Sequence, residues 1–122
     1  MSKKVIIDAF FNQFNSFLEE LRQMYPEDSD FPVFITTLSM MKTMNPMLVI
    51  NFVKDEILPH SARIEAKDEN FLRDYKYEAY EGVDLNIVEK LKEYNANSSP
   101  ATKETIWNYF NIIIKLCRLA TE

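Results

Sequence analysis

Glycine is almost absent from this chain, and its scarcity constrains the fold more than any other feature of the sequence. The 122 residues include a single glycine, Gly82. Tight hairpins and phosphate-cradling loops need positive φ angles, which glycine adopts without steric cost. Four of the five prolines lie where a helix would start or stop, namely Pro26, Pro32, Pro46 and Pro100. Between them, apolar residues recur at three- and four-residue spacing, so the pattern predicts an all-α fold.

The longest periodic segment covers about residues 4–24, near the N-terminus. Its apolar side chains share one face of a helix, and Phe11 and Leu18 make that face broad enough to meet a globular core. Pro26 and the polar run after it should end the helix. The members of the face are Ile7, Phe10, Phe14, Phe17, Leu21 and Met24.

Prolines also mark the start of the next two helices, because a proline in the first turn costs no backbone hydrogen bond. A second helix should open at Asp30 or Phe31, and a third at Pro46, where Asn45 caps it and Pro59 closes it. The short connection between them predicts a helical hairpin or corner. The expected buried face of the second helix consists of Phe31, Phe34, Ile35, Leu38 and Met41.

Capping residues mark the remaining helices. Asp68 can cap a helix that ends at Gly82, Asp84 can cap a short helix that runs to about Tyr94, and Ser99 precedes the last helix. The helix after Asp68 would carry Phe71, Leu72, Tyr75 and Ala79, and the last would bury Ile106, Trp107, Phe110, Ile113, Ile114 and Cys117. We therefore expect residues 1–122 to form a single domain, a compact bundle of five to six helices. Its long N- and C-terminal helices should pack together.

Composition indicates a globular, intracellular protein. A hydrophobic fraction of 47% with 27% charged residues is typical of a globular domain. The single cysteine, Cys117, excludes an intrachain disulfide and fits a reducing compartment. We find no signal-peptide pattern and no run near the ~20 apolar residues of a membrane span. We therefore expect a cytoplasmic or other intracellular protein without a membrane span.

Charge disfavours nucleic acid as a partner. The net charge is −5, from 14 basic and 19 acidic residues that are mixed along the chain. Nucleic-acid binders usually gather lysine and arginine on one face, and no such stripe is visible. An accessory factor acting on nucleic acid remains an alternative, in which the fold brings scattered basic residues together.

The residue types that carry enzyme chemistry do not form a recognisable set. His60 is the only histidine, Pro59 separates it from Glu56, and no further histidine or cysteine completes a metal-ligand set. Cys117 lies on an apolar stripe, whereas a reactive thiol needs a polar, partly exposed setting. With one glycine, the chain has no phosphate-binding loop. We expect no catalytic residue, no metal site, no cofactor and no enzyme activity.

Methionines crowd the junction of the second and third helices. Met40 and Met44 are candidate partner-binding residues, together with the neighbouring Met41 and Met47. Methionine either fills irregular gaps in a core or forms an adaptable groove for a partner helix, and both interpretations stay open. A third interpretation is a small-molecule carrier with an apolar cavity under these methionines.

Tyrosines form the second candidate cluster. Tyr75, Tyr77 and Tyr80 lie in the acidic middle segment. Tyrosine is favoured at interfaces because it is apolar with one polar tip, although these residues could equally cover the edge of the core. The face around Phe14 in the first helix could instead serve a homodimer, because its spacing is that of a short coiled-coil seam.

Several segments are similar to a group of viral proteins. They are Phe14–Met24 with the following Tyr25-Pro26-Glu27-Asp28, Phe31–Leu38, Asn45-Pro46, Ile57-Leu58-Pro59-His60, Asp68–Leu72 and Ile106–Phe110. In these segments the chain resembles small helical proteins of nucleocytoplasmic large DNA viruses. The resemblance implies a viral protein in the host cell or the virion. It implies no site, because the shared residues are packing and capping residues. The sequence as a whole predicts a non-enzymatic protein–protein interaction or structural module that binds a protein partner or self-associates.

Overall fold

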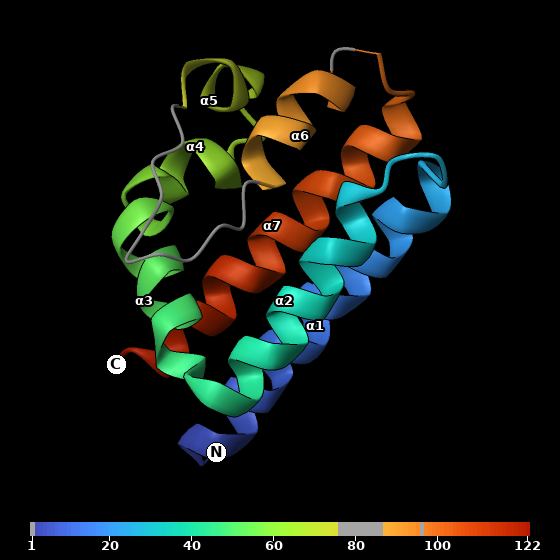
Figure 1. The fold of residues 1–122 in the computed structure, drawn as a ribbon. Coiled ribbons are helices and arrows are strands. Elements are labelled where there is room, and N and C mark those ends of the chain that lie inside the picture. Colours follow the sequence, from blue (N-terminus) through green and yellow to red (C-terminus); the bar gives the residue numbers. More distant parts are fainter. Residues whose placement is uncertain (1, 76–86, 96) are drawn as a thin grey trace.

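The fold is a bundle of helices, shown in Figure 1 as a computed structural model that describes residues 2–75, 87–95 and 97–122. Every regular element in these ranges is helical, which confirms the predicted all-α fold. The elements are α1 (Lys3–Met24), α2 (Asp30–Met44), α3 (Pro46–Glu56), the 3₁₀ helix η1 (Leu58–His60), α4 (Ser61–Glu65), α5 (Glu69–Asp74), α6 (Ile87–Asn95) and α7 (Pro100–Ala120).

The two longest helices, α1 and α7, lie side by side through the bundle, as the sequence predicts (Figure 1). Rings from both helices meet between them. Phe17 stacks on Tyr109 with ring centroids 5.1 Å apart, and its ring meets that of Phe110 edge to face at 5.8 Å. The expected buried residues of α7 are all buried, and those of α1 are buried except Ile7, which is half-buried, and Met24, which is exposed.

Helices α2 and α3 meet at a corner. α2 and the segment Pro46–Glu65 are bent by 113° relative to each other, so the connection is a corner rather than a hairpin. Phe31, Phe34 and Leu38 are buried as expected, but the side chain of Asn45 makes no capping hydrogen bond to α3. α3 ends at Glu56, two residues earlier than predicted, and the chain continues through η1 into α4.

The segment after η1 corrects the sequence analysis twice. The short helix α4 was not expected, because its end lacks the usual glycine; Lys67 takes the left-handed conformation instead, with φ of 54°. Two backbone hydrogen bonds close this turn, from the Lys67 N–H to Ile64 (3.0 Å) and from the Asp68 N–H to Arg63 (2.9 Å). The second correction concerns Tyr75, whose backbone is extended, so α5 ends at Asp74 and does not include it.

Two predicted helix caps are confirmed, because each side chain accepts a hydrogen bond from a backbone N–H of its own helix. Asp68 accepts a hydrogen bond from the Asn70 N–H at 2.9 Å and caps α5. Ser99 accepts one from the Thr102 N–H at 3.2 Å and caps α7. The predicted Asp84 cap and Gly82 terminator lie outside the described residues, as does Ala79.

Candidate interaction surface

The outer face of α2 carries exposed apolar side chains. Val33, Met40 and Met44 are 59%, 55% and 73% exposed. Their spacing of seven and four residues places them on one side of the helix, roughly opposite the buried Phe31 and Leu38. We call these three residues the α2 stripe. The structure thus brings the candidate residues Met40 and Met44 together with Val33, which the sequence analysis did not single out although its helical spacing could have identified it.

The other two methionines at the corner belong to the core. Met41 and Met47 are partly buried and pack against the main hydrophobic cluster. The core interpretation therefore applies to Met41 and Met47, and the partner-binding interpretation stays a prediction for Met40 and Met44. Met41 and Met47 pack against the core, whereas Met40 and Met44 face outward.

A groove of about 660 Å³ opens beside the N-terminal end of α2, between α2 and α6. Val33 belongs both to the α2 stripe and to the lining of this α2/α6 groove. The described lining residues are Asp30, Val33 and Phe34 from α2, and Glu89, Lys90, Lys92 and Glu93 from α6. The groove therefore continues the apolar surface of α2 into a charged region.

Four residues, which we call the Asp28 clamp, hold α6 against the turn between α1 and α2. The Lys90 ammonium lies 3.1 Å from Asp28 Oδ2 and 2.8 Å from Asp30 Oδ2. The Tyr94 hydroxyl donates to Asp28 Oδ2 at 2.6 Å, and the Asp28 side chain is only 9% exposed. The turn between α1 and α2 is thus bonded to the helix that forms the other wall of the groove.

The clamp shifts the ionisation of its own members. Burial opposes ionisation of Asp28, but hydrogen bonds from Tyr94, the Asp30 backbone and Lys90 outweigh burial and lower its pKa. The hydrogen bond to Asp28, with burial, raises the pKa of Tyr94 to about 12. Hydrogen bonds to Asp30 and then Asp28 raise the pKa of Lys90. At neutral pH Asp28 is therefore a carboxylate, Lys90 an ammonium and Tyr94 a neutral phenol.

Stacked aromatic rings support the clamp. Tyr25, at the end of α1, stacks on Tyr94 with ring centroids 3.8 Å apart and an interplanar angle of 16°. The ring of Phe31 lies 6.1 Å from each of them. The Tyr25 hydroxyl also forms a hydrogen bond with Ser98 at 3.1 Å. Rings and charges together fix one wall of the groove relative to the other.

The tyrosine cluster is only partly within the described residues, and Tyr77 and Tyr80 lie outside them. Tyr75 is 7% exposed, and its ring lies 5.7 Å from that of Phe71 and 6.0 Å from that of His60. Tyr75 therefore covers the edge of the core, the second of the two roles open from the sequence. With so little exposed surface, it does not belong to the candidate interaction surface.

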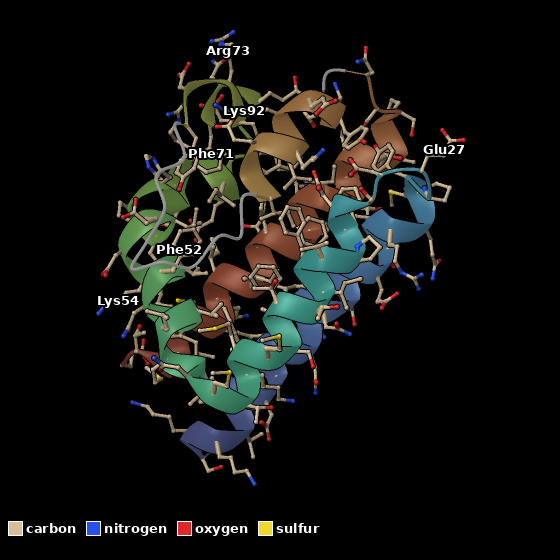
Figure 2. All side chains as sticks on the ribbon, viewed as in Figure 1. Glu27, Phe52, Lys54, Phe71, Arg73 and Lys92 are labelled. Carbon is tan, nitrogen blue, oxygen red and sulfur yellow. The ribbon has the colours of Figure 1, made fainter. Side chains whose placement is uncertain are left out.

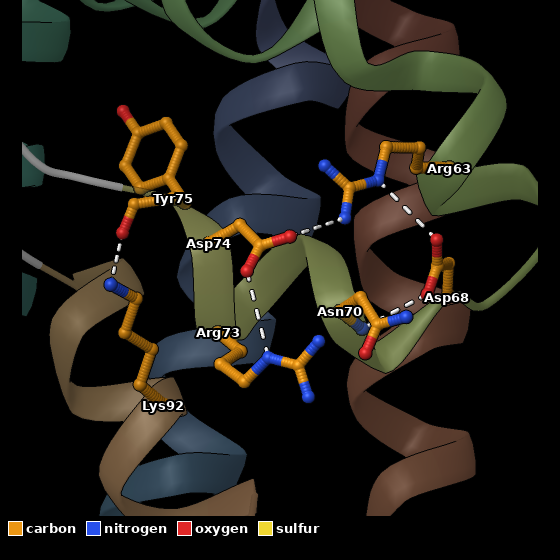
Figure 3. Close-up of polar contacts among 7 residues, drawn as sticks. All are labelled: Arg63, Asp68, Asn70, Arg73, Asp74, Tyr75 and Lys92. Carbon is orange, nitrogen blue, oxygen red and sulfur yellow. Dashed lines mark hydrogen bonds and ion pairs between the residues drawn. The ribbon is translucent and has the colours of Figure 1, made fainter.

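Polar contacts around Tyr75 connect α4, α5 and α6 (Figure 3). Arg63 reaches both Asp68 Oδ2, at 3.3 Å, and Asp74 Oδ2, at 3.2 Å. The Lys92 ammonium points at the backbone carbonyl of Tyr75 and donates a hydrogen bond to it. Because Lys92 is also 3.2 Å from Glu89, its charge is already compensated within the fold.

A second open pocket, of about 440 Å³, lies between α5, α6 and α7 and is lined by three cationic side chains. Lys103 is 3.0 Å from Glu69, and Arg73 is 3.5 Å from Asp74. The third, Lys92, has the two partners described above. Arg73 lies at the periphery of the molecule, as do Lys54 and Glu27, whereas Phe52 and Phe71 point into the bundle (Figure 2). The described cations of this pocket therefore leave no unpaired positive charge for a ligand.

Cys117 and His60, whose side chains are the most reactive types in the described residues, both make contacts within the fold. Burial raises the pKa of the Cys117 thiol to about 12, and its Sγ lies 3.4 Å from the Ile50 carbonyl, so the thiolate is disfavoured. His60 packs against the ring of Phe71 with centroids 5.1 Å apart. Among the residues that the structure describes, no three His, Cys, Asp or Glu side chains converge as a metal-ligand set.

An apolar cavity exists, but away from the α2 methionines. It measures about 30 Å³ and is lined by aromatic and aliphatic side chains of α1, α3, α6 and α7. Ligand pockets usually measure about 300–1,000 Å³, so this cavity is too small for a carried molecule. The carrier interpretation thus receives no support from the described part of the chain.

Comparison with known proteins assigns this chain to no family. No protein-family model matches the chain, and neither a curated protein nor a solved structure matches it.

Within residues 2–75, 87–95 and 97–122, no helix alone is long and apolar enough to cross a membrane. α2 and the segment Pro46–Glu65 meet those criteria only as a bent pair.

Proposed function

We propose that this chain is a non-enzymatic protein–protein interaction module and that it binds its partner through the α2 stripe. The supporting observation is the exposure of Val33, Met40 and Met44 along one side of a helix whose opposite side is in the core. The proposal follows the expectation from sequence for Met40 and Met44 and leaves Tyr75 out. Tyr77 and Tyr80 stay as predicted contacts only.

The outer face of α2 lacks the charges that surface helices normally carry. Between Asp30 and Lys42 the helix has no charged residue. An amphipathic surface helix normally has charged and polar side chains opposite its buried face. Removing exposed apolar area from water is favourable by roughly 25 cal/mol per Å², so covering the α2 stripe would stabilise a complex.

An apolar helix of the partner is the occupant that fits this surface. Val33 and Met44 are eleven residues apart, so the α2 stripe is about 16 Å long, and a partner helix of about three turns covers it. Methionine side chains adapt to the shape of an apolar helix, as in other helix-binding grooves. The resemblance to viral proteins would place that partner in the host cell or the virion.

Site-specific photo-crosslinking in cells that express the chain tests the proposal. A photoreactive amino acid at position 44 should yield one discrete adduct, and the same amino acid at position 112 should not. Ile112 is the matched control because it is an apolar residue, 41% exposed, on α7. The adduct protein, once purified, should bind the chain, and Met40→Glu with Met44→Glu should abolish binding, whereas Ile112→Glu should not.

Two results would overturn the proposal. One is a set of adducts that is the same at positions 44 and 112. The other is a purified partner that binds the Met40→Glu, Met44→Glu variant as well as it binds the unmodified chain. Thermal unfolding of both variants serves as the folding control, because exposed residues should change stability by no more than about 0.5 kcal/mol each.

A further inference from the structure

We infer that the partner helix carries a lysine or arginine at the end that lies against the α2/α6 groove. This inference rests on the proposed function and adds the charge of the partner to it. The α2 stripe and the groove share Val33, so a helix that lies along the stripe reaches the groove at the N-terminal end of α2. The chemistry of the groove therefore decides which residue the partner places there.

The two lysines of the groove are already engaged. Lys90 contacts Asp28 at 3.1 Å and Asp30 at 2.8 Å. Lys92 bonds to the Tyr75 carbonyl and to Glu89 at 3.2 Å. The two lysine side chains are half-buried, with 23% and 22% of their surface exposed. An acidic residue of a partner would have to break an existing ion pair or hydrogen bond to gain one of these ammonium groups.

The carboxylates of the groove are more accessible. Glu93 is exposed and forms no ion pair with any residue that the structure describes. Asp30 is also exposed at the groove and Glu89 is half-buried there, and each has one lysine neighbour. Three carboxylates thus face two engaged ammonium groups. A cation from the partner gains a free carboxylate there, whereas an anion meets repulsion, and such complementarity governs specificity more than affinity.

The groove exists before the partner arrives. The Asp28 clamp bonds α6 to the turn before α2, and the Tyr25–Tyr94 stack holds the same junction. Binding at a preformed site loses no free energy to the ordering of the site's walls. The position of Glu93 relative to Val33 is therefore set by the fold, and the end of the partner helix that carries the cation is specified.

A display library of helical peptides, selected on the purified full chain, tests this inference. Selected peptides should have apolar residues at i, i+3 or i+4, and i+7, with lysine or arginine enriched at one end. Replacing that terminal cation by glutamate should weaken binding by about fivefold to tenfold. Added salt should narrow the difference, because exposed charges are screened.

A charge reversal identifies the residue responsible. Glu93→Lys should remove the preference for a terminal cation and shift selection towards glutamate or aspartate. Glu27→Lys is the matched control, because Glu27 is also exposed and without an ion pair in the described residues but does not line the groove. That variant should select the same basic peptides as the unmodified chain.

The outcomes separate this inference from the proposed function. Peptides that need Met40 and Met44 but show no terminal charge preference would overturn the inference and leave the α2 stripe as the binding surface. A homodimer that Met40→Glu and Met44→Glu dissociate, seen by light scattering, would make a second copy the occupant and would also overturn the inference. Peptides that bind the Met40→Glu, Met44→Glu variant unchanged, or the failure to select any peptide, would overturn both.

Discussion

Where α1 meets α7, the contacts are between aromatic rings, whereas α6 meets the turn between α1 and α2 through charges and hydroxyl groups as well as stacked rings. Phe17 lies against Tyr109 and Phe110 in the first region. In the second, a single carboxylate, Asp28, accepts from Tyr94 and pairs with Lys90. The first region is long and continuous, whereas the polar part of the second depends on a few atoms.

The two regions should therefore differ in how their stability responds to pH. Apolar burial is non-directional and changes little with pH, so the α1–α7 contact should persist wherever the chain folds. Hydrogen bonds and ion pairs need correct protonation and geometry. The Asp28 clamp also positions one wall of the α2/α6 groove. The attachment that depends on protonation is therefore the one that shapes the candidate interaction surface.

The largest effect should follow from a change in the apolar region. Phe17→Ala should lower the free energy of unfolding by about 3–5 kcal/mol, because the removed ring leaves a cavity between α1 and α7. Phe17→Leu keeps most of the apolar volume and should cost about 1.5 kcal/mol. Urea unfolding measures both. A surface substitution such as Ile112→Ala should change the free energy of unfolding by no more than about 0.5 kcal/mol. If Phe17→Ala costs as little as that, the assignment of α1–α7 as the main core is contradicted.

An intermediate effect should follow from a change in the clamp. Asp28→Asn should cost about 1–2 kcal/mol, because Lys90 loses a charged partner and the bond from Tyr94 weakens. Hydrogen exchange should show faster opening of α6 amides, while α1 and α7 amides keep their relative protection. Glu27→Gln, at the adjacent exposed position, is the control and should change neither. Equal acceleration in all three helices would show that α6 is not separately attached.

The smallest effect should appear in the pH dependence of stability. The pKa of Asp28 is lowered in the folded protein, so its contribution is complete above the unfolded value of about 3.9 and is lost as pH falls through the folded value. The stability difference between the unmodified chain and Asp28→Asn should thus be constant near neutral pH and shrink below about pH 4. Urea unfolding at a series of pH values measures it. A difference that grows on acidification would contradict the lowered pKa.

Local features of the fold were predictable because neighbouring residues decide them. The caps at Asp68 and Ser99 act within their own helices, and the apolar spacing around Phe17 sets the buried side of α1. The outward position of Met40 and Met44 follows from the same spacing. The end of α4 was missed because Lys67 occupies a left-handed position where glycine is usual. Tyr75 was assigned to α5 because helical spacing with Phe71 could not reveal that the backbone becomes extended there.

Contacts between distant segments could not be predicted from the sequence. Asp28 and Lys90 are far apart in the chain, and neither lies in a motif that would pair them. The same holds for Tyr25 and Tyr94, whose stacking depends on the path of the chain between them. The groove beside Val33 arises only because the clamp brings α6 to α2, so its carboxylates and engaged lysines could not be found from spacing.

The sequence by itself determined the longer helices, most of their boundaries and the side of each that is buried, because helix formation and apolar periodicity depend on residues within a few turns of one another. The tertiary structure alone decided that Tyr75 was buried and that Lys90 was bound by two carboxylates. Those outcomes depend on how helices pack, and side chains far apart in the sequence compete for the same partners and the same space.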